Sequence, residues 1–297
     1  MNKKVTDEWL YTISPKKSAI NLNFKEIWYY RDLLLLFVKR DVITIYKQTI
    51  LGPLWYFIQP LFTSVIFTLV FNNIADIKTG EGVPSFLFNL AGITSWNYFS
   101  ACLTGTSDTF KQNQGIFGKV YFPRVIMPMS TVLSNLIKFG IQLLVFISFY
   151  IYILFFTETA YNTTISIAIV WLPLTILIMA LLGLGLGMMI SSMTTKYRDL
   201  NFLVGFGVQL LMYGSAVMYP ISLIQDKVTQ GVLPDWVGNL IEYNPMTTVI
   251  ELFRHMTLGV GEFSFFNLLY ATIVSIVVFI LGLIVFNRTE KQFIDTV

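Results

Sequence analysis

Charged residues are scarce in this chain. Asp, Glu, Lys and Arg together make up 12% of the 297 residues, whereas hydrophobic residues make up 55%, and the mean hydropathy is +0.66. A soluble domain of this length needs more polar surface than that, so a soluble globular protein is excluded. Six long apolar stretches hold most of the hydrophobic residues, at 54–75, 86–107, 130–156, 167–192, 200–219 and 265–287. Each reaches or approaches the roughly 20 residues that a helix needs to cross a bilayer. The sequence therefore predicts an all-α polytopic membrane protein with six transmembrane helices.

Cysteine and histidine are almost absent. Cys102 is the single cysteine and His255 the single histidine, which excludes disulfides and thiol-based metal clusters. Gly183, Gly185 and Gly187 superficially match a nucleotide-binding fingerprint, but they lie inside an apolar stretch with no preceding strand, and this favours close helix packing instead. The sequence has no phosphate-binding loop of the Walker A type. We expect no metal and no cofactor in this chain, and no ATP hydrolysis by the chain itself.

An embedded enzyme is the competing class of protein. Acyl or glycosyl transfer generally needs a positioned base or a metal ligand. His255 lies beside Arg254 in a polar segment, where an ordinary surface or capping role is more common. Asp235 and Glu242 lie in a loop that Pro234 and Pro245 interrupt, so nothing fixes them as an acid and base pair. We therefore expect no catalytic residue.

Ionisable residues are also scarce inside the apolar stretches. Only Lys138 lies clearly within one, about two turns from its end, where its stem could reach toward the lipid headgroups. Proton-coupled carriers need ionisable groups at mid-membrane. A transporter without such a relay must draw its energy from elsewhere, for example from an attached ATPase. A proton-driven carrier stays the alternative from another class.

Lysine and arginine are distributed unevenly between the two sides that the six stretches define. If the N-terminus is cytoplasmic, the outer side receives only Lys78, Lys227 and Arg254, and its segments are acidic. This asymmetry is the positive-inside signature, so we predict that both termini are cytoplasmic, with tails at 1–22 and 288–297. Residues 5–23 contain no apolar h-region, so we expect no signal peptide. The net charge of +3 gives no indication of nucleic-acid binding.

A short amphipathic segment precedes the first stretch. Asn23 and Glu26 have the spacing of a helix N-cap and its reciprocal partner, and an apolar and aromatic run follows between basic residues. The run is too short and too charged to span, so residues 23–53 predict an interfacial helix and its connector. Two interpretations stay open: a simple membrane-surface anchor, or a docking surface for a cytoplasmic partner.

The polar segment at 220–264 precedes the last apolar stretch. Val249, Leu252, Phe253 and Met256 recur at helical spacing and predict one apolar face of a short helix. Glu251 and Arg254 are three residues apart on the same helix, which predicts an ordinary surface ion pair.

Several motifs together resemble the ABC-2 type permeases that export polysaccharides, and they cover nearly the whole chain in order. They are Arg40-Asp41, Tyr46-Lys47, Leu51-Gly52-Pro53-Leu54-Trp55, Pro60, Phe122-Pro123-Arg124, Pro128, Tyr197-Arg198-Asp199-Leu200, Asn244-Pro245-Met246, Glu251 and Arg254. Two departures are Ile45, where the family commonly has a basic residue, and a long N-terminal extension at 1–22.

The resemblance implies a homodimer in a bacterial cytoplasmic (inner) membrane, paired with two copies of an ATP-binding subunit, that exports lipid-linked O-antigen, capsule or teichoic acid polysaccharide. It implies a transmembrane domain at 54–287 whose segment 220–264 forms re-entrant or interfacial helices at the outer gate. The residues expected to contact the ATPase subunit are Glu26, Arg31, Lys39, Arg40, Phe117, Lys119, Phe122, Arg124, Arg198 and Asp199. An exporter of a drug or small lipid is the alternative within the same superfamily.

Aromatic side chains would suit a sugar path, because sugar rings have apolar faces edged by hydroxyl groups. The candidates for the substrate channel are Trp55, Tyr56, Trp96, Tyr98, Phe99, Tyr213 and Tyr219. With 26 Phe, 15 Tyr and 6 Trp in the chain, most aromatic residues are expected to face lipid or to form interfacial belts instead.

Overall fold

The computed structural model describes residues 24–47, 52–80, 82–117, 119–120, 122–156, 165–197 and 199–296. Every regular element in these ranges is helical, which confirms the all-α prediction. The predicted N-terminal tail at 1–22 lies outside the described residues. In chain order the elements are α1 (Phe24–Tyr29), α2 (Arg31–Lys47), η1 (Gly52–Leu54), α3 (Trp55–Phe67), η2 (Thr68–Ile74), α4 (Ser85–Ser107), α5 (Thr109–Phe117), α6 (Ile126–Phe156), η3 (Ile167–Trp171), α7 (Leu172–Thr194), α8 (Leu200–Tyr213), α9 (Ile221–Thr229), α10 (Asp235–Glu242), α11 (Pro245–Leu258) and α12 (Phe265–Thr296).

Within the described part of the chain, four helical segments are long and apolar enough to cross a membrane. They are Trp55–Ile74, Ile126–Phe156, Ile167–Thr194 and Phe265–Glu290. These segments coincide with four of the six predicted stretches. The stretch at 86–107 forms α4, which is 23 residues long but less apolar, and the stretch at 200–219 forms α8, which has 14 residues and ends at Tyr213 rather than at 219.

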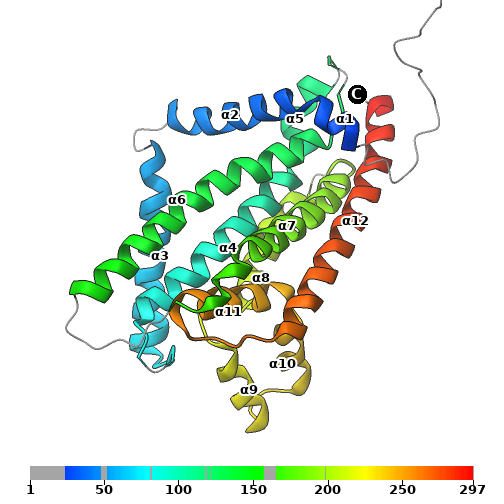
Figure 1. The fold of residues 1–297 in the computed structure, drawn as a ribbon. Coiled ribbons are helices and arrows are strands. Elements are labelled where there is room, and N and C mark those ends of the chain that lie inside the picture. The colour runs from blue at the N-terminus through cyan, green and yellow to red at the C-terminus, as the bar shows by residue number, and fades with distance from the viewer. Residues whose placement is uncertain are drawn as a thin grey trace, which may run out of the picture.

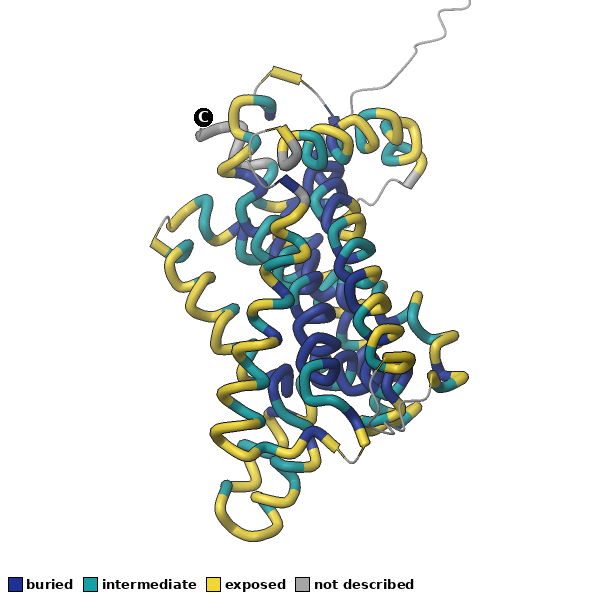
Figure 2. The backbone as a smooth tube through the Cα atoms, turned by 90° about the vertical axis from the view of Figure 1, so that its left-hand side faces the viewer, coloured by how far each residue is buried: buried dark blue, intermediate teal, exposed yellow. Residues whose placement is uncertain are grey.

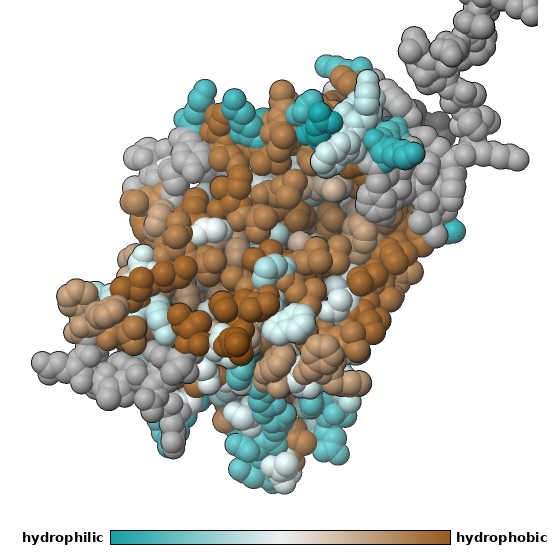
Figure 3. All heavy atoms as spheres, in the orientation of Figure 1, coloured by the Kyte–Doolittle hydropathy of each residue, from teal (hydrophilic) through white to brown (hydrophobic). Residues whose placement is uncertain are grey.

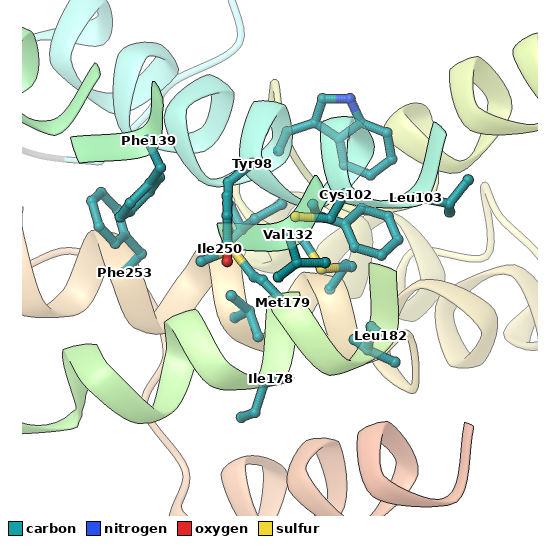
Figure 4. Packing of buried hydrophobic residues seen from close by; sticks show 14 of the residues in the cluster. Tyr98, Cys102, Leu103, Val132, Phe139, Ile178, Met179, Leu182, Ile250 and Phe253 are labelled. Carbon is teal, nitrogen blue, oxygen red and sulfur yellow. The ribbon is translucent and has the colours of Figure 1, made fainter. Parts of the chain in front are cut away.

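Helix α4 is the centre of the bundle. It packs against α7, α6, α11 and α3, and it is buried along most of its length (Figure 2). Because its neighbours are protein rather than lipid, α4 tolerates polar residues whose hydrogen bonds stay inside the bundle. Asn89 donates to Asn72 Oδ1 at 2.8 Å, and Thr94 donates to Leu90 O at 2.7 Å. These polar residues explain why α4 is less apolar than the outer helices. Figure 4 shows the core beside it, where Tyr98 and Cys102 of α4 meet Met179 of α7 and Ile250 of α11.

Glycines bring α7 close to both of its main neighbours, as the sequence predicted. A Cβ atom added at Gly183 would lie 2.7 Å from Cβ of Cys102, and one added at Gly187 would lie 2.5 Å from Cβ of Thr106, both on α4. Gly185 faces α12 on the opposite side and meets Gly282 there. The glycine pattern is therefore a packing device between three helices.

Helices α1, α2 and α5 lie at one end of the bundle, where α2 runs across the ends of the long helices (Figure 1). The described end of α12 reaches the same end, which we call the α2 end. Leu34 N–H donates to Tyr30 O at 3.0 Å, so α1 and α2 are nearly continuous and extend the predicted surface helix to Lys47. Helices α9 and α10 project from the other end, which we call the α9 end. Hydrophilic groups gather at both ends, and an apolar band lies between them (Figure 3).

Candidate functional site

The α2 end joins three segments that are far apart in the sequence. The ring of Phe37 in α2 lies 5.8 Å from that of Phe122, and the ring of Phe117 lies 6.0 Å from Phe122 on the other side. All three side chains are buried. Aromatic contacts thus hold the turn after α5 against the buried face of α2. A displacement of α2 would therefore also move this turn.

Arg124 connects the same turn to α12. Its guanidinium lies 5.0 Å from the ring of Phe117, its Nη1 donates to Glu290 O at 3.3 Å, and its Nε lies 3.9 Å from Glu290 Oε1. Burial lowers the pKa of Arg124, and the charge of Glu290 partly opposes this. We call Phe37, Phe117, Phe122, Arg124 and Glu290 the coupling cluster.

The predicted ATPase contacts divide into buried and exposed residues. Phe117, Phe122 and Arg124 are buried in the coupling cluster. Glu26 is half-buried, and the remaining described side chains are exposed at the α2 end: Arg31, Lys39, Arg40, Lys119 and Asp199. Arg198 lies outside the described residues. The structure therefore brings buried packing residues and exposed charges to one end, while their contact with a partner stays a prediction.

At the α9 end, Arg254 of α11 is completely buried. Its guanidinium donates to the main-chain oxygens of Val217 at 2.6 Å and Ala216 at 2.9 Å, and to Glu251 Oε1 at 2.9 Å. Longer bonds of 3.4 Å reach Phe88 O and Tyr219 O, and the guanidinium stacks 3.6 Å from the ring of Phe88. Burial lowers the pKa of Arg254 to about 10, and Glu251 opposes the shift, so the group remains charged at neutral pH.

The predicted ion pair of Glu251 and Arg254 forms at 2.9 Å, but its predicted place on the surface is wrong. Glu251 is 3% exposed and Arg254 is 0% exposed. The apolar face of α11 was predicted correctly, since Val249, Leu252, Phe253 and Met256 are all buried in this helix. The opposite face is also covered, however, because residues 214–219 leave α8 in a non-helical course and pass over it.

Two further residues complete this arrangement: Asn244, which the sequence motifs included without a structural role, and Gly92, which sequence reasoning missed. Asn244 caps α11 by accepting from Met246 N at 3.0 Å, while its Nδ2 donates to Gly214 O and Ser215 Oγ, both at 2.9 Å. A Cβ atom at Gly92 of α4 would lie 2.5 Å from Val217 O and 2.7 Å from Arg254 Nη2, so only glycine leaves room there. We call Gly92, Asn244, Glu251, Arg254 and residues 214–219 the outer clamp. An Asn-Pro helix start was the available signal for Asn244.

The predicted channel residues fall into two groups. Trp96, Tyr98 and Phe99 of α4 are 5%, 3% and 1% exposed and pack inside the chain, with Tyr98 5.2 Å from the ring of Phe139 (Figure 4). The others reach the surface: Trp55 and Tyr213 are exposed, and Tyr56 and Tyr219 are half-buried. A place in a substrate channel stays a prediction for all seven.

Residues 32–258 match the ABC-2 type transporter family. The match begins in α2 and ends at the last residue of α11, so it includes the turn after α5 and the outer clamp. This chain belongs to the ABC-2 type transporter family.

Several similar proteins have names that refer to glycan export. The O-antigen export system permease protein RfbA of Klebsiella pneumoniae is 27% identical over 270 residues, which cover 90% of this chain and 95% of the relative. RfbA of Myxococcus xanthus is 25% identical over 231 residues, covering 77% and 82% of the two chains. The polysialic acid transport protein KpsM of Escherichia coli is 20% identical over 257 residues, covering 86% and 93%.

Membership of the ABC-2 family settles the class of the protein. It is a multi-pass inner-membrane permease of the ABC transporter type, and such a permease works with a separate ATP-binding subunit. The resemblance seen in the sequence motifs is confirmed.

Proposed function

We propose that this ABC-2 permease is the membrane subunit of an ATP-driven exporter that moves lipid-linked polysaccharide outward. The observation that carries the proposal is the alignment with O-antigen permeases over nearly the full length of both chains. The class of the cargo therefore follows from relatives that align with most of the chain, rather than from one shared motif.

The membrane topology in this proposal has six crossings. Helices α4 and α8 join the four long apolar segments, with α4 enclosed by protein and α8 completing its crossing through the non-helical residues 214–219. The α2 end is cytoplasmic, because lysine and arginine predominate there and acidic residues at the α9 end. The helices of 220–264 then lie at the outer exit, and the outer clamp holds α11 against α4.

ATP-driven movement enters at the α2 end. The exposed charges of α1, α2, Lys119 and Asp199 suit a polar contact with the ATP-binding subunit, which supplies ATP and magnesium. The coupling cluster supports this route, since it fixes α2 to the turn at 116–124 and to α12. A displacement of α2 would therefore move both the turn after α5 and α12.

The complete transporter is a homodimer with two ATP-binding subunits. Within the described residues, no side chain of α8 is fully buried, although one face packs partly against the core, and Phe202, Leu203, Phe206 and Tyr213 are exposed. The side chain of Trp55 on α3 is likewise exposed on the surface of the chain. A two-fold dimer would place such surfaces around a central path, which one bundle cannot enclose. Trp55, Tyr56, Tyr213 and Tyr219 are then the best candidates for sugar contacts.

The test is ATP-dependent glycan movement into proteoliposomes. The permease and its ATP-binding subunit together should move lipid-linked polysaccharide when ATP is supplied, and a protonophore should leave the rate unchanged. The permease alone should move nothing. Movement without the ATP-binding subunit, or movement abolished by the protonophore, would contradict the proposal.

A further inference from the structure

A polar cavity of about 540 Å³ lies at the α2 end, between α2, α4, α5 and α6. Its volume falls within the range of small-molecule sites, roughly 300 to 1,000 Å³. Eight of its fifteen lining residues carry hydroxyl or amide groups, and Arg40, Asp41 and Lys138 add charged side chains. Such a lining is unexpected beside α6, which is otherwise one of the long apolar helices.

Lys138 carries its charge deep into this cavity. From Ile126, where α6 begins, the helix rises about 18 Å to Lys138. The side chain turns back toward the α2 end, as the sequence predicted, and Nζ donates to Asn135 Oδ1 at 2.7 Å. The ring of Tyr56 in α3 lies 5.6 Å from Nζ. Among the described residues, no carboxylate oxygen lies within 4.0 Å of this ammonium group.

Asp41 is engaged by another cation. Arg40 Nη2 lies 2.8 Å from Asp41 Oδ1, and Ser134 Oγ donates to Asp41 Oδ2 at 3.5 Å. The charge of Asp41 also acts on Lys138 across the cavity. Arg40, Asp41 and Lys138 together leave the cavity with a net charge of +1. A charge within a membrane helix is costly and is generally retained for a function. The net positive charge therefore favours an anionic ligand in this cavity.

We propose that this cavity binds the phosphate group that joins lipid to glycan in the transported substrate, an assignment that rests on the proposed function. The phosphate oxygens accept from Lys138 Nζ in a charge-assisted hydrogen bond. The hydroxyl groups of Thr104, Ser130 and Thr131 already donate to their own helix backbones, so their oxygens are available as acceptors for sugar hydroxyls. One cavity thereby offers a cation for the phosphate and acceptors for the first sugar.

The position of the cavity suits a lipid headgroup. Helix α2 lies across the ends of the long helices, where headgroups of a bilayer are found, and the cavity opens below it. Exposed apolar side chains of α3, such as Phe57 and Phe62, offer a surface for the lipid chain. A phospholipid phosphate has the same chemistry as the substrate phosphate, so the experiment must separate these two sources.

The experiment measures binding of farnesyl diphosphate to the permease purified with its ATP-binding subunit in phosphatidylcholine nanodiscs. Replacing Lys138→Gln should weaken binding by about ten- to a hundredfold, since one charge-assisted hydrogen bond is lost. Lys111→Gln is the matched control, because Lys111 is an exposed lysine of α5 outside the cavity. It should leave the affinity unchanged. Lys138→Arg keeps the charge and should retain most of the binding, which guards against a folding artefact.

Two further arms identify the ligand. Farnesol lacks the phosphate, so its binding should be insensitive to Lys138→Gln. Phosphatidylglycerol should compete only weakly with farnesyl diphosphate. Unchanged diphosphate binding by the Lys138→Gln variant would overturn the site, and equal competition by phosphatidylglycerol would overturn its assignment to the substrate. Either result would leave the wild-type transport assay intact, so failure of this inference is distinguishable from failure of the proposed function.

Discussion

Arg254 of α11 and Lys138 of α6 are two cations of the helical bundle whose hydrogen bonds differ greatly in number. Arg254 at the α9 end donates to four main-chain oxygens and one carboxylate and stacks on Phe88. Lys138 near the α2 end donates to one side-chain amide oxygen beside an open cavity. A charge whose hydrogen bonds are all made inside the chain has no capacity left for a ligand, so Arg254 is structural. A charge with unused donors beside a cavity is available for binding.

The two ends of the bundle should also differ in how easily their parts move relative to one another. The outer clamp joins α4, α11 and residues 214–219 through buried polar contacts, so its parts should move as one body. The α2 end combines a polar cavity with aromatic contacts to a surface helix. Changing aromatic contacts costs less free energy than breaking a buried ion pair. Movement driven from the α2 end would therefore change the cavity before it opened the clamp.

The largest effect should follow from replacing Arg254→Gln. Glu251 would remain buried without its partner, and main-chain oxygens of residues 216–219 would lose their donors. Breaking a buried ion pair in this way costs about 3–5 kcal/mol. Unfolding in mixed micelles with increasing SDS measures the loss. Lys227→Gln, an exposed cation on α9 at the same end, should cost almost nothing. Equal stability of the two variants would show that the clamp does not hold the outer end.

A smaller loss should follow from Gly92→Ala, which leaves every charge in place. The added Cβ would lie within 2.7 Å of both Val217 O and Arg254 Nη2, so α4 must move away from the clamp. Overpacking of this kind costs about 1–3 kcal/mol. Gly140→Ala in α6 is the control, since nothing lies within 4 Å of its added Cβ. The same SDS titration should leave that variant at least as stable as wild type.

The sequence predicted the helices but not the outer clamp, and the reason is physical. Hydropathy and spacing report on side chains, and they located the long apolar helices, the surface helix and the glycine contacts of α7. Arg254 is satisfied mainly by main-chain oxygens of a segment about 37 residues away, and a main-chain oxygen has no sequence signature. For the same reason Glu251 and Arg254, three residues apart, resembled a surface pair.

The sequence also did not predict where α8 ends or that α4 is enclosed by protein. Residues 200–219 are mostly apolar, so composition did not show that the helix stops at Tyr213 and that the chain continues as an irregular segment. Hydropathy also cannot distinguish a helix in lipid from one enclosed by protein. Trp96 and Phe99 were thus placed on a helix correctly, while their packing inside the chain emerged only from the fold.

The coupling cluster should show an intermediate effect on stability and a larger one on transport. Arg124 is buried, but its contact with Glu290 Oε1 spans 3.9 Å, so Arg124→Gln should cost only about 1–2 kcal/mol. Because the turn after α5 would lose its connection to α12, ATP hydrolysis by the complex should continue while glycan transport falls. Parallel ATPase and transport assays would reveal this uncoupling. Arg288→Gln, an exposed arginine on α12, should preserve the ratio of transport to hydrolysis. A proportional fall in both activities for Arg124→Gln would contradict the role in coupling.

The smallest effect on stability should come from Lys138→Leu, although this variant also removes a cation from the bundle. Removing Lys138 abolishes a single hydrogen bond and relieves the cost of keeping an ammonium group within a membrane helix, so the change should lie within about 1 kcal/mol of zero. The SDS titration used for Arg254→Gln measures both variants on one scale. Transport of lipid-linked glycan should nevertheless be lost, and Lys138→Arg should restore part of it. A destabilisation as large as that of Arg254→Gln would mean that Lys138 is a second structural cation, and the contrast between the two ends would then disappear.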